Sequence, residues 1–597
     1  MTRTDLLQEL RASMAEHGLA AYLIPNTDPH QSEYIADHWR LMPWLSGFDG
    51  SAGTMIITPD FAGVWTDSRY FIQAERQLRG SGFKLMKLNV PHTPEYIGWL
   101  VEHLPPGGTV GVDGQLISQS KATDLQKALI TGGCSLSDVG DLVGPIWKDR
   151  PEIPSKPIQK HALEYSGLSR VNKLEQLRMS MAKHGADFHV LSSLDDIAWL
   201  LNIRGADVDY NPVAISHALV GDCDTKLFVD PTKMPESLIK RLHEQSIWVQ
   251  PYEDFFHALG QIPSEKSVYI DPKRVSVATF KALPEGVRVI MGQNLTIPLK
   301  AIKNQVEIDH ARRTAVKDGV AMVRLLKWLE EAVPQGGVTE LTVDEKLQEF
   351  RAEQPDFVGP SFGTIAGYLD HGAIVHYSAT PELAHELKPE GMFLLDSGGQ
   401  YLDGTTDITR TISLGNPTQA EKEDFTLVLK GYIGLDSAIF PAGTKGYQLD
   451  ILARQHLWSR GRNYGHGTGH GVGFYLNVHE GPQNFSPAAN QTAFEVGMIT
   501  SNEPGLYRNG KYGIRTENLM LCVEHSDTEF GKFLAFETLT LCPIDLNLVN
   551  LSLMNEQEID WLNSYHDEVR TALSLMLNDE EKTWLEEKTR PIERVTR

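Results

Sequence analysis

Apolar residues recur every three or four positions through residues 306–333, which predicts one long helix that Pro334 ends. The same helical spacing returns beyond Met554, where charged residues separate the apolar ones. Another amphipathic helix is expected over residues 1–18. Between Pro334 and about residue 545 the pattern changes to short alternating runs that glycines interrupt, which is typical of strands. We therefore expect a strand-rich segment with a helix on either side of it.

A short sequence occurs twice along the first half of the chain. Residues 10–18 and 177–185 are identical at seven of nine positions, and each copy reads as a helix that ends at a glycine. Each copy leads into a short apolar strand, at residues 20–24 and 189–191. Two copies of one helix–strand unit predict two domains of the same α/β type.

Proline-rich segments mark the boundaries between the expected domains. Residues 147–157 hold three prolines within seven positions and read as a linker, and a second break lies near residues 298–304. The predicted divisions are 1–150, 151–303 and 304–597, the last with a helical extension over about 545–597. The expected fold class is α/β (α+β). The extension is interpreted as a packing or dimerisation element.

Composition narrows the classes of function. Of the 597 residues, 41% are hydrophobic and 22% are charged, as in an ordinary globular protein, and the formal net charge is -23. Such a chain repels nucleic-acid phosphates, so nucleic-acid binding is not expected. The four cysteines are scattered without a CxxC pair, which argues against a disulfide framework and against a cysteine-based zinc site. No apolar run suits a signal peptide or a membrane span. We therefore expect a cytoplasmic location and no association with a membrane.

Two aspartates follow one another across a predicted strand pair. An apolar run ends at Asp396, turn residues follow, and an alternating run then carries Asp407 with Thr409 and Thr411 in phase. Two strands joined this way can place both aspartates side by side, which is costly unless a cation neutralises them. Asp403 precedes a glycine and is interpreted as a turn residue.

Histidines and glutamates complete this set of candidate ligands. Glycine occupies every second position from 465 to 473 and brackets His466 and His470, and His479 follows shortly after. No offset in this run satisfies GxGxxG, so a dinucleotide-binding site is not expected. The glycines instead predict a backbone that must approach another part of the structure closely. Glu503 precedes a Pro-Gly turn, and Glu517 lies in an alternating strand.

Taken together, four carboxylates and one imidazole suit two divalent ions of the manganese, cobalt or zinc kind. The candidate metal ligands are Asp396, Asp407, His470, Glu503 and Glu517. Four negative charges and a bridging hydroxide nearly balance two dications. Such a metal pair generates a nucleophilic hydroxide at neutral pH.

These motifs, in this order, resemble the pita-bread metallopeptidases, and within them the long, three-domain Xaa-Pro aminopeptidases. The resemblance covers nearly the whole chain. Residues 46–54 and 65–70 look like the first domain of that family, and the following segments look like its catalytic domain: 373–377, 396–410, 465–482 and 503–517. The resemblance implies two creatinase-N-like α/β domains followed by a pita-bread catalytic domain.

The resemblance also implies roles for the candidate residues. Asp396 is expected to bind one metal, His470 and Glu503 the other, and Asp407 and Glu517 to bridge both. The catalytic residues implied are His376, His479, Glu503 and His466, with Glu503 as general base and His479 passing a proton. The substrate-binding residues implied are His376, His479, Tyr507 and Arg515.

The activity implied is hydrolysis of the N-terminal Xaa-Pro bond of peptides by a hydroxide that bridges two divalent metals. Manganese is the metal expected, with cobalt or zinc as alternatives, and a homodimer is implied. Proline lacks a backbone N–H and its ring fixes φ, so a dedicated pocket is reasonable. Two departures from the family pattern occur at Asn502 and at Leu369–His371, and the second can alter the loop near His376.

Other functions remain open at this point. A prolidase, which cleaves only dipeptides that end in proline, has the same fold and metals, although tandem N-terminal domains favour the aminopeptidase. A methionine aminopeptidase has no use for those two domains. A non-catalytic binding protein or a creatinase-like hydrolase on this fold is expected to lack the ligands, and here all five are present.

Overall fold

The computed structural model describes residues 2–89 and 93–593 and divides into two compact units. The N-terminal unit comprises residues 1–162 and 168–297, and the C-terminal unit comprises residues 163–167 and 298–597. Each unit has its own sheets and its own hydrophobic core. In the part of the chain that is described, no helix has the length and apolar character needed to cross a membrane.

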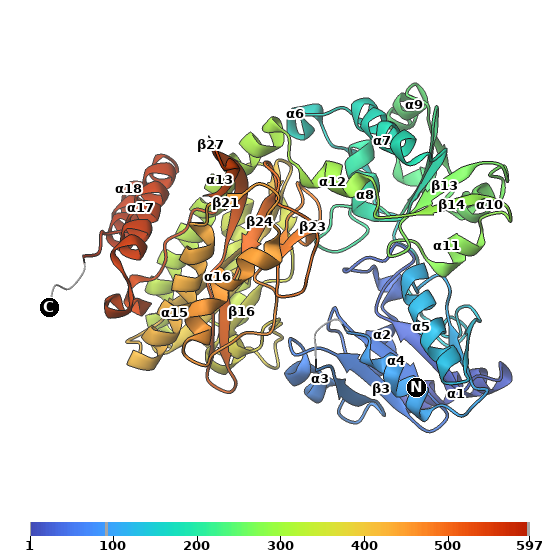
Figure 1. The fold of residues 1–597 in the computed structure, drawn as a ribbon. Helices are drawn as coiled ribbons and strands as arrows, with labels where there is room; N and C mark the ends of the chain where they lie inside the picture. Colours follow the sequence, from blue (N-terminus) through green and yellow to red (C-terminus); the bar gives the residue numbers. More distant parts are fainter. Residues whose placement is uncertain (1, 90–92, 594–597) are drawn as a thin grey trace. The chain divides into compact units, whose positions relative to one another are not determined.

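The N-terminal unit contains two six-stranded sheets with the same topology (blue and green in Figure 1). The first has the order β4-β3-β2-β1-β5-β6, with β1 Ala21–Pro25, β2 Thr54–Ile57, β3 Ala62–Thr66, β4 Lys84–Lys87, β5 Thr109–Val112 and β6 Ser135–Asp138. The second has the order β12-β11-β10-β8-β13-β14, with β8 Phe188–Leu191, β10 His217–Gly221, β11 Thr225–Phe228, β12 Ile247–Gln250, β13 Ser267–Ile270 and β14 Arg288–Met291. In both, the central strand pairs antiparallel on one side and parallel on the other.

The repeated sequence opens each of these sheets, as expected. Helix α1 (Arg3–Glu16) precedes β1, and helix α7 (Arg170–His184) precedes β8. The glycine after each helix adopts a positive φ, +64° at Gly18 and +66° at Gly185, which reverses the chain into the strand. The prediction of two similar α/β folds is therefore confirmed. Residues 147–157, the expected linker, form no helix or strand.

The C-terminal unit is built around the long helix α13 (Gln305–Ala332), which matches the helix predicted over residues 306–333. The side chain of Asn304 caps it, and Pro334 lies in the 3-10 turn that follows. The other large helices are α14 (Glu340–Ala352), α15 (Gln419–Asp436) and α16 (Gly446–Trp458). The expected strand-rich segment therefore contains helices as well as strands.

Three sheets of this unit hold the candidate residues. A three-stranded sheet has the order β16-β17-β20, with β16 Ile365–Tyr368, β17 Met392–Ser397 and β20 Ile408–Ser413. A six-stranded sheet has the order β21-β28-β27-β24-β22-β23, with β21 Phe440–Pro441, β22 Gly469–Gly471, β23 Glu480–Phe485, β24 Ile499–Asn502, β27 Asn518–Thr528 and β28 Gly531–Thr538. The hairpin of β25 (Gly505–Arg508) and β26 (Tyr512–Arg515) is the third.

The C-terminal extension consists of helices α17 (Glu556–Leu573) and α18 (Asp579–Lys588), which are red in Figure 1. Leu562 and Val569 of α17 are fully buried, in one core cluster with Val323 of α13 and Val428 of α15. The amphipathic pattern of this tail is thus explained by packing on α13 and α15. Residues 594–597, at its end, lie outside the described residues.

Candidate metal centre

The two aspartates come together because their strands pair. Asp396 lies on β17 opposite Thr409 of β20, and Asp407 immediately precedes β20. Both side chains are buried, with residue exposures of 7% for Asp396 and 4% for Asp407. The strand pair predicted from the alternating pattern is confirmed.

The histidine and the two glutamates come from neighbouring strands of the six-stranded sheet. His470 is the middle residue of β22. Glu503 directly follows β24 and Glu517 directly precedes β27, where Asn502 and Asn518 are partners in the antiparallel register. This pairing places both glutamates at the same end of the sheet.

Close contacts between backbones explain the alternating glycines before and after His470. A Cβ atom on Gly469 would lie 1.9 Å from the carbonyl oxygen of Ser501, and one on Gly471 would lie 2.2 Å from the carbonyl oxygen of Glu480. Only glycine fits at these two positions. The expectation of a close backbone approach around His470 is confirmed, with neighbouring strands as the partners.

The two sheets meet at a compact group of ligand atoms. Single ligand atoms of Asp407, His470 and Glu517 lie within 4.8 Å of one another. Nε2 of His470 is 3.4 Å from Asp407 Oδ2 and 3.6 Å from Glu503 Oε1. About a fifth of the His470 and Glu503 side chains is exposed, at 22% and 19%, so the group is open to small molecules.

The four-carboxylate cluster consists of Asp396, Asp407, Glu503 and Glu517. Burial, followed by the charges of neighbouring carboxylates, raises the pKa of Asp396 to about 7 and that of Glu517 well above its usual value. Burial also raises the pKa of Glu503. Burial alone would lower the pKa of His470, but its hydrogen bond to Asp407 and the charge of Glu503 raise it to about 9. The protein alone thus holds too much negative charge here, which is the condition that a bound cation relieves.

Two ligand atoms are directed as a metal site requires. Within the described ranges, no group donates a hydrogen bond to the buried Oδ1 of Asp396. Nδ1 of His470 lies 2.9 Å from the carbonyl oxygen of Gly471 and donates to it, so Nε2 is the nitrogen that faces the cluster and that would bind a metal ion once its own proton is displaced. The donor set therefore fits divalent ions.

A chain of polar side chains leads away from Asp396. Arg515 donates from Nη2 to Asp396 Oδ2 at 2.5 Å and from Nη1 to the hydroxyl of Tyr507 at 2.6 Å. Nε2 of His466 lies 2.8 Å from the same hydroxyl. The ring of His479 meets that of His470 edge-on at 4.4 Å. The structure therefore gathers these four predicted residues next to the candidate metal ligands.

His376 lies on the turn that follows the 3-10 helix η5 (Leu369–Ala373). A Cβ atom on Gly513 of β26 would lie 1.7 Å from the carbonyl oxygen of Gly372, so η5 packs backbone to backbone on the β25–β26 hairpin. This hairpin carries Tyr507 and Arg515. The segment that leads to His376 is thus tied to the same wall of the site.

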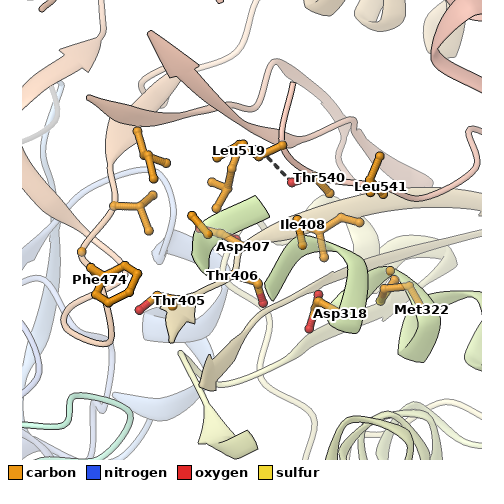
Figure 2. A pocket seen from close by; sticks show the side chains of 18 residues that line it. Asp318, Met322, Thr405, Thr406, Asp407, Ile408, Phe474, Leu519, Thr540 and Leu541 are labelled. Carbon is orange, nitrogen blue, oxygen red and sulfur yellow. Dashed lines mark hydrogen bonds between the residues drawn. The ribbon is translucent and has the colours of Figure 1, made fainter. Parts of the chain in front are cut away.

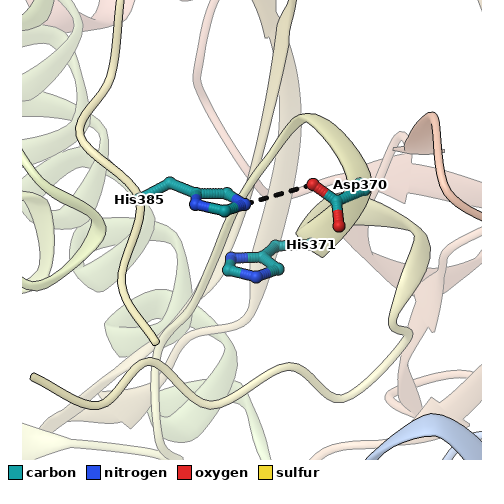
Figure 3. A group of neighbouring side chains, drawn as sticks. All are labelled: Asp370, His371 and His385. Carbon is teal, nitrogen blue, oxygen red and sulfur yellow. Dashed lines mark hydrogen bonds and ion pairs between the residues drawn. The ribbon is translucent and has the colours of Figure 1, made fainter. Parts of the chain in front are cut away.

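A second group of possible ligands, Asp370, His371 and His385, lies in the same loop region (Figure 3). Nε2 of His385 is 3.1 Å from Asp370 Oδ1. The two imidazoles are stacked, 3.7 Å between centroids and 4° between planes. A nitrogen lone pair lies in its ring plane, and no ion can lie in two parallel planes at once. In this arrangement the group does not chelate a metal.

This second group is an anchor around Glu340, the first residue of α14. Glu340 is fully buried and accepts hydrogen bonds from Tyr377 Oη at 2.8 Å and His371 Nδ1 at 3.0 Å. It also accepts the backbone N–H groups of Tyr368 and His385, both at 2.8 Å. The anchor holds the chain on both sides of His376. The sequence analysis singled out Leu369–His371 only as a departure and missed Glu340, since nothing local connects it to this loop.

The cavity in Figure 2 is a separate feature. It measures about 20 Å³ and lies between α13, residues 404–408 and β27. Its walls are mostly apolar, with Met322 and Leu519 among them, and Asp407 contributes to one side. This volume holds about one water molecule and cannot hold a peptide.

Asp403 stays outside the metal centre, as its interpretation as a turn residue implies. It lies in a turn and pairs with Lys317 Nζ at 2.5 Å. Sequence reasoning did not assign a role to Thr409, whose hydroxyl donates to Glu517 Oε2 at 2.7 Å. Its position in phase with Asp407 was the only signal available.

Comparison with known proteins agrees with this architecture. The Creatinase/Prolidase N-terminal domain matches residues 7–146 and, in a second form, 149–307. Metallopeptidase family M24 matches residues 309–524, and the C-terminal region of peptidase M24 matches residues 532–592. The two N-terminal matches agree with the repeated topology of the first two sheets.

Similar proteins span the whole chain. A probable Xaa-Pro aminopeptidase P of Laccaria bicolor is 41% identical over 99% of this chain and 94% of its own length. Aminopeptidase P2 of Arabidopsis thaliana is 40% identical over 98% of this chain and 88% of its own. The crystal structure of X-prolyl aminopeptidase from Caenorhabditis elegans, described as a cytosolic enzyme with a di-nuclear active site, is 36% identical. It superposes with a TM-score of 0.95 and covers 99% of this chain and 100% of that one. The chain therefore belongs to metallopeptidase family M24, among the Xaa-Pro aminopeptidases.

Proposed function

We propose that this protein is a metal-dependent aminopeptidase that hydrolyses the N-terminal Xaa-Pro bond of peptides. The observation that carries the proposal is the four-carboxylate cluster with His470, whose ligand atoms converge and whose pKa shifts call for a cation. The full-length similarity to Xaa-Pro aminopeptidases supports the choice of substrate.

The chain's own residues suit two divalent ions. Asp396 would hold one ion and His470 with Glu503 the other, while Asp407 and Glu517 would bridge both. The Oδ1 of Asp396, which receives no hydrogen bond from the described residues, and the orientation of His470 Nε2 toward the cluster support this assignment. When bound, the two ions supply Lewis acidity for the scissile carbonyl and lower the pKa of water. Four carboxylates to one imidazole favour manganese over softer metals.

The remaining polar residues would handle the substrate. Glu503, open at one side of the cluster, would take a proton from the attacking water. His479, edge-on to His470, would pass a proton to the proline nitrogen as the bond breaks. His376 would steady the peptide. All three assignments agree with the motif positions of the family.

The proline pocket would be formed next to Asp396. Arg515 is held between Asp396 and Tyr507, and Tyr507 is held in turn by His466. These contacts fix the aromatic ring of Tyr507, and a rigid ring suits the ring of proline. Tyr507 and Arg515 would therefore bind substrate, and His466 would support catalysis through Tyr507.

Hydrolysis of Arg-Pro-Pro tests the proposal, with Arg-Ala-Ala and Arg-Pro as controls, after EDTA treatment and again with Mn²⁺ restored. Release of arginine from Arg-Pro-Pro that disappears with EDTA and returns with Mn²⁺ is expected. Failure with Mn²⁺, Co²⁺ and Zn²⁺ alike, although two ions bind, would overturn the proposal and favour a non-catalytic binding protein.

Prolidase activity is the second candidate. The Xaa-Pro dipeptidase of Bacillus anthracis has the same fold at 24% identity and a TM-score of 0.51, but it covers only 63% of this chain. This likeness shows a shared fold alone, whereas the full-length similarity to Xaa-Pro aminopeptidases favours the aminopeptidase. Cleavage confined to Arg-Pro in the assay above would reverse this preference.

The proposal extends to the domains, the assembly and the location of the protein. The domains proposed are residues 1–150, 151–303 and 304–597, with an extension from about 545. A cytoplasmic homodimer is proposed, in line with the cytosolic Caenorhabditis elegans enzyme. Sedimentation equilibrium tests the dimer, and a monomer at micromolar concentration would contradict it.

A further inference from the structure

Arg410 of β20 is a buried guanidinium between the metal ligands and the C-terminal extension. Only 2% of the residue is exposed. It lies three positions after Asp407, and its five N–H groups meet six acceptors. These are the carbonyl oxygens of Pro543 (3.0 Å), Thr409 (2.9 Å), Glu517 (2.8 Å) and Cys542 (2.9 Å), Oδ1 of Asn518 (2.8 Å) and the hydroxyl of Tyr565 (2.9 Å).

One side of the guanidinium secures the two strands that carry Asp407 and Glu517. Nη1 donates to the carbonyl oxygens of Thr409 and Glu517 together. The backbone N–H of Glu517 donates to that same carbonyl of Thr409 at 3.1 Å, and the Thr409 hydroxyl holds Glu517 Oε2 at 2.7 Å. Every polar group of Glu517 except one carboxylate oxygen is therefore fixed by residues 409 and 410.

The other side of the guanidinium binds the segment that leads into the extension. Nη2 donates toward Tyr565, which lies on α17 and is 3% exposed. The Tyr565 hydroxyl accepts the N–H of Cys542 at 3.2 Å and donates to Thr540 O at 3.0 Å. Asn518 and Cys542 also accept hydrogen bonds from Nη2, so the Tyr565 hydroxyl contributes by holding the guanidinium and residues 540–542 in one fixed arrangement.

We propose that Arg410 and Tyr565 are positioning residues through which the C-terminal extension holds Asp407 and Glu517 in place for metal binding. The inference rests on the proposed metal centre, and it gives residues 545–593 a part in that centre in addition to packing. A planar, permanently charged group with five donors can bridge both strands and the extension at once, which a lysine cannot. Groups that orient metal ligands typically change metal affinity by about 10- to 100-fold when they are removed.

Calorimetric titration of Mn²⁺ into the metal-free full-length protein tests this inference. Tyr565→Phe keeps the ring and removes only the hydroxyl, so it is expected to fold and to bind Mn²⁺ about 10-fold more weakly. Arg410→Lys is expected to weaken binding further. Raised Mn²⁺ concentration should restore the activity of Tyr565→Phe, because the catalytic groups themselves are intact.

Glu558→Gln is the matched control. Glu558 also ties α17 to the rest of the unit, by an ion pair with Lys430 of α15 at 2.6 Å, but it does not touch Arg410. This variant is expected to lower the melting temperature and to leave the Mn²⁺ dissociation constant within about twofold, since its effect is on packing alone.

The outcomes separate the inference from the proposed function. If Tyr565→Phe binds both ions as tightly as wild type while its melting temperature falls like that of Glu558→Gln, the extension is only a packing element and the inference is wrong. If the wild-type protein itself binds no Mn²⁺, the proposed metal centre is wrong first.

Discussion

Among the buried carboxylates of the C-terminal unit, Glu340 and the four-carboxylate cluster have different surroundings. Glu340 accepts hydrogen bonds from four groups, at 2.8 to 3.0 Å. In the four-carboxylate cluster, the charges outnumber the cationic partners, and Oδ1 of Asp396 receives no hydrogen bond from the described residues. The first carboxylate is stabilised by the protein alone, whereas the cluster needs an added cation. Counting donors around each oxygen therefore separates an anchor from a metal site.

The largest effect is expected at the cluster itself. Glu517→Gln keeps the shape of the side chain but removes a bridging charge, so kcat/KM on Arg-Pro-Pro should fall by more than about 100-fold. Calorimetry should also show fewer Mn²⁺ ions bound per chain. Asp403→Asn is the control, because Asp403 is buried against Lys317 outside the cluster. Equal losses in both variants would contradict the distinction between them.

The anchor should respond in the opposite way. Glu340→Gln leaves one oxygen to serve four donors, so the free energy of unfolding should fall by about 3 kcal/mol. Mn²⁺ affinity should stay unchanged, while KM should rise because the chain around His376 loosens. Chemical denaturation and steady-state kinetics measure these quantities. The control is Glu349→Gln, at an exposed position of the same helix, which is expected to change neither the free energy of unfolding nor KM. A loss of bound Mn²⁺ in Glu340→Gln would break the comparison.

A smaller effect is expected at Thr409, whose hydroxyl orients Glu517. Thr409→Val should weaken Mn²⁺ binding about 10-fold, and Thr409→Ser should restore most of the affinity because it keeps the hydroxyl. If the serine variant binds as weakly as the valine variant, lost packing rather than the hydrogen bond explains the effect.

The pH dependence of stability should show the mildest effect. The pKa of Asp396 is raised to about 7, so its folded carboxyl prefers the proton, and stability falls as pH rises from about 4 to 7. The pKa of His470 is raised to about 9, so the stability from its charge is lost as pH rises through 9. When no metal is bound, both pKa shifts make the protein less stable as the pH rises.

Thermal unfolding of the EDTA-treated and the Mn²⁺-loaded protein between about pH 4 and 10 measures this effect. The metal-free protein should lose on the order of 2–5 °C in melting temperature relative to the loaded one. A gap between the two forms that stays constant with pH would show that the cluster's charge does not limit stability.

Sequence reasoning reached what local patterns encode. The helix over residues 306–333 and the candidate ligands Asp407 and His470 follow from spacing and from turn residues. The alternating glycines predicted that the backbone around His470 approaches another segment closely. They could not identify Ser501 as the partner, because that contact depends on which strands pair. Glu340 and Arg410 escaped notice for the same reason. Their partners lie up to 45 and 155 residues away in sequence, where no periodicity links them.

The close contact between Gly372 and Gly513 has a consequence for protein engineering. At 1.7 Å from a neighbouring oxygen, a single added methyl group at Gly513 would force the segment leading to His376 away from the hairpin of Tyr507 and Arg515. Libraries that aim to broaden the range of accepted peptides should therefore keep both glycines fixed. Diversity is better placed at side chains that would line the proline pocket, such as Tyr507.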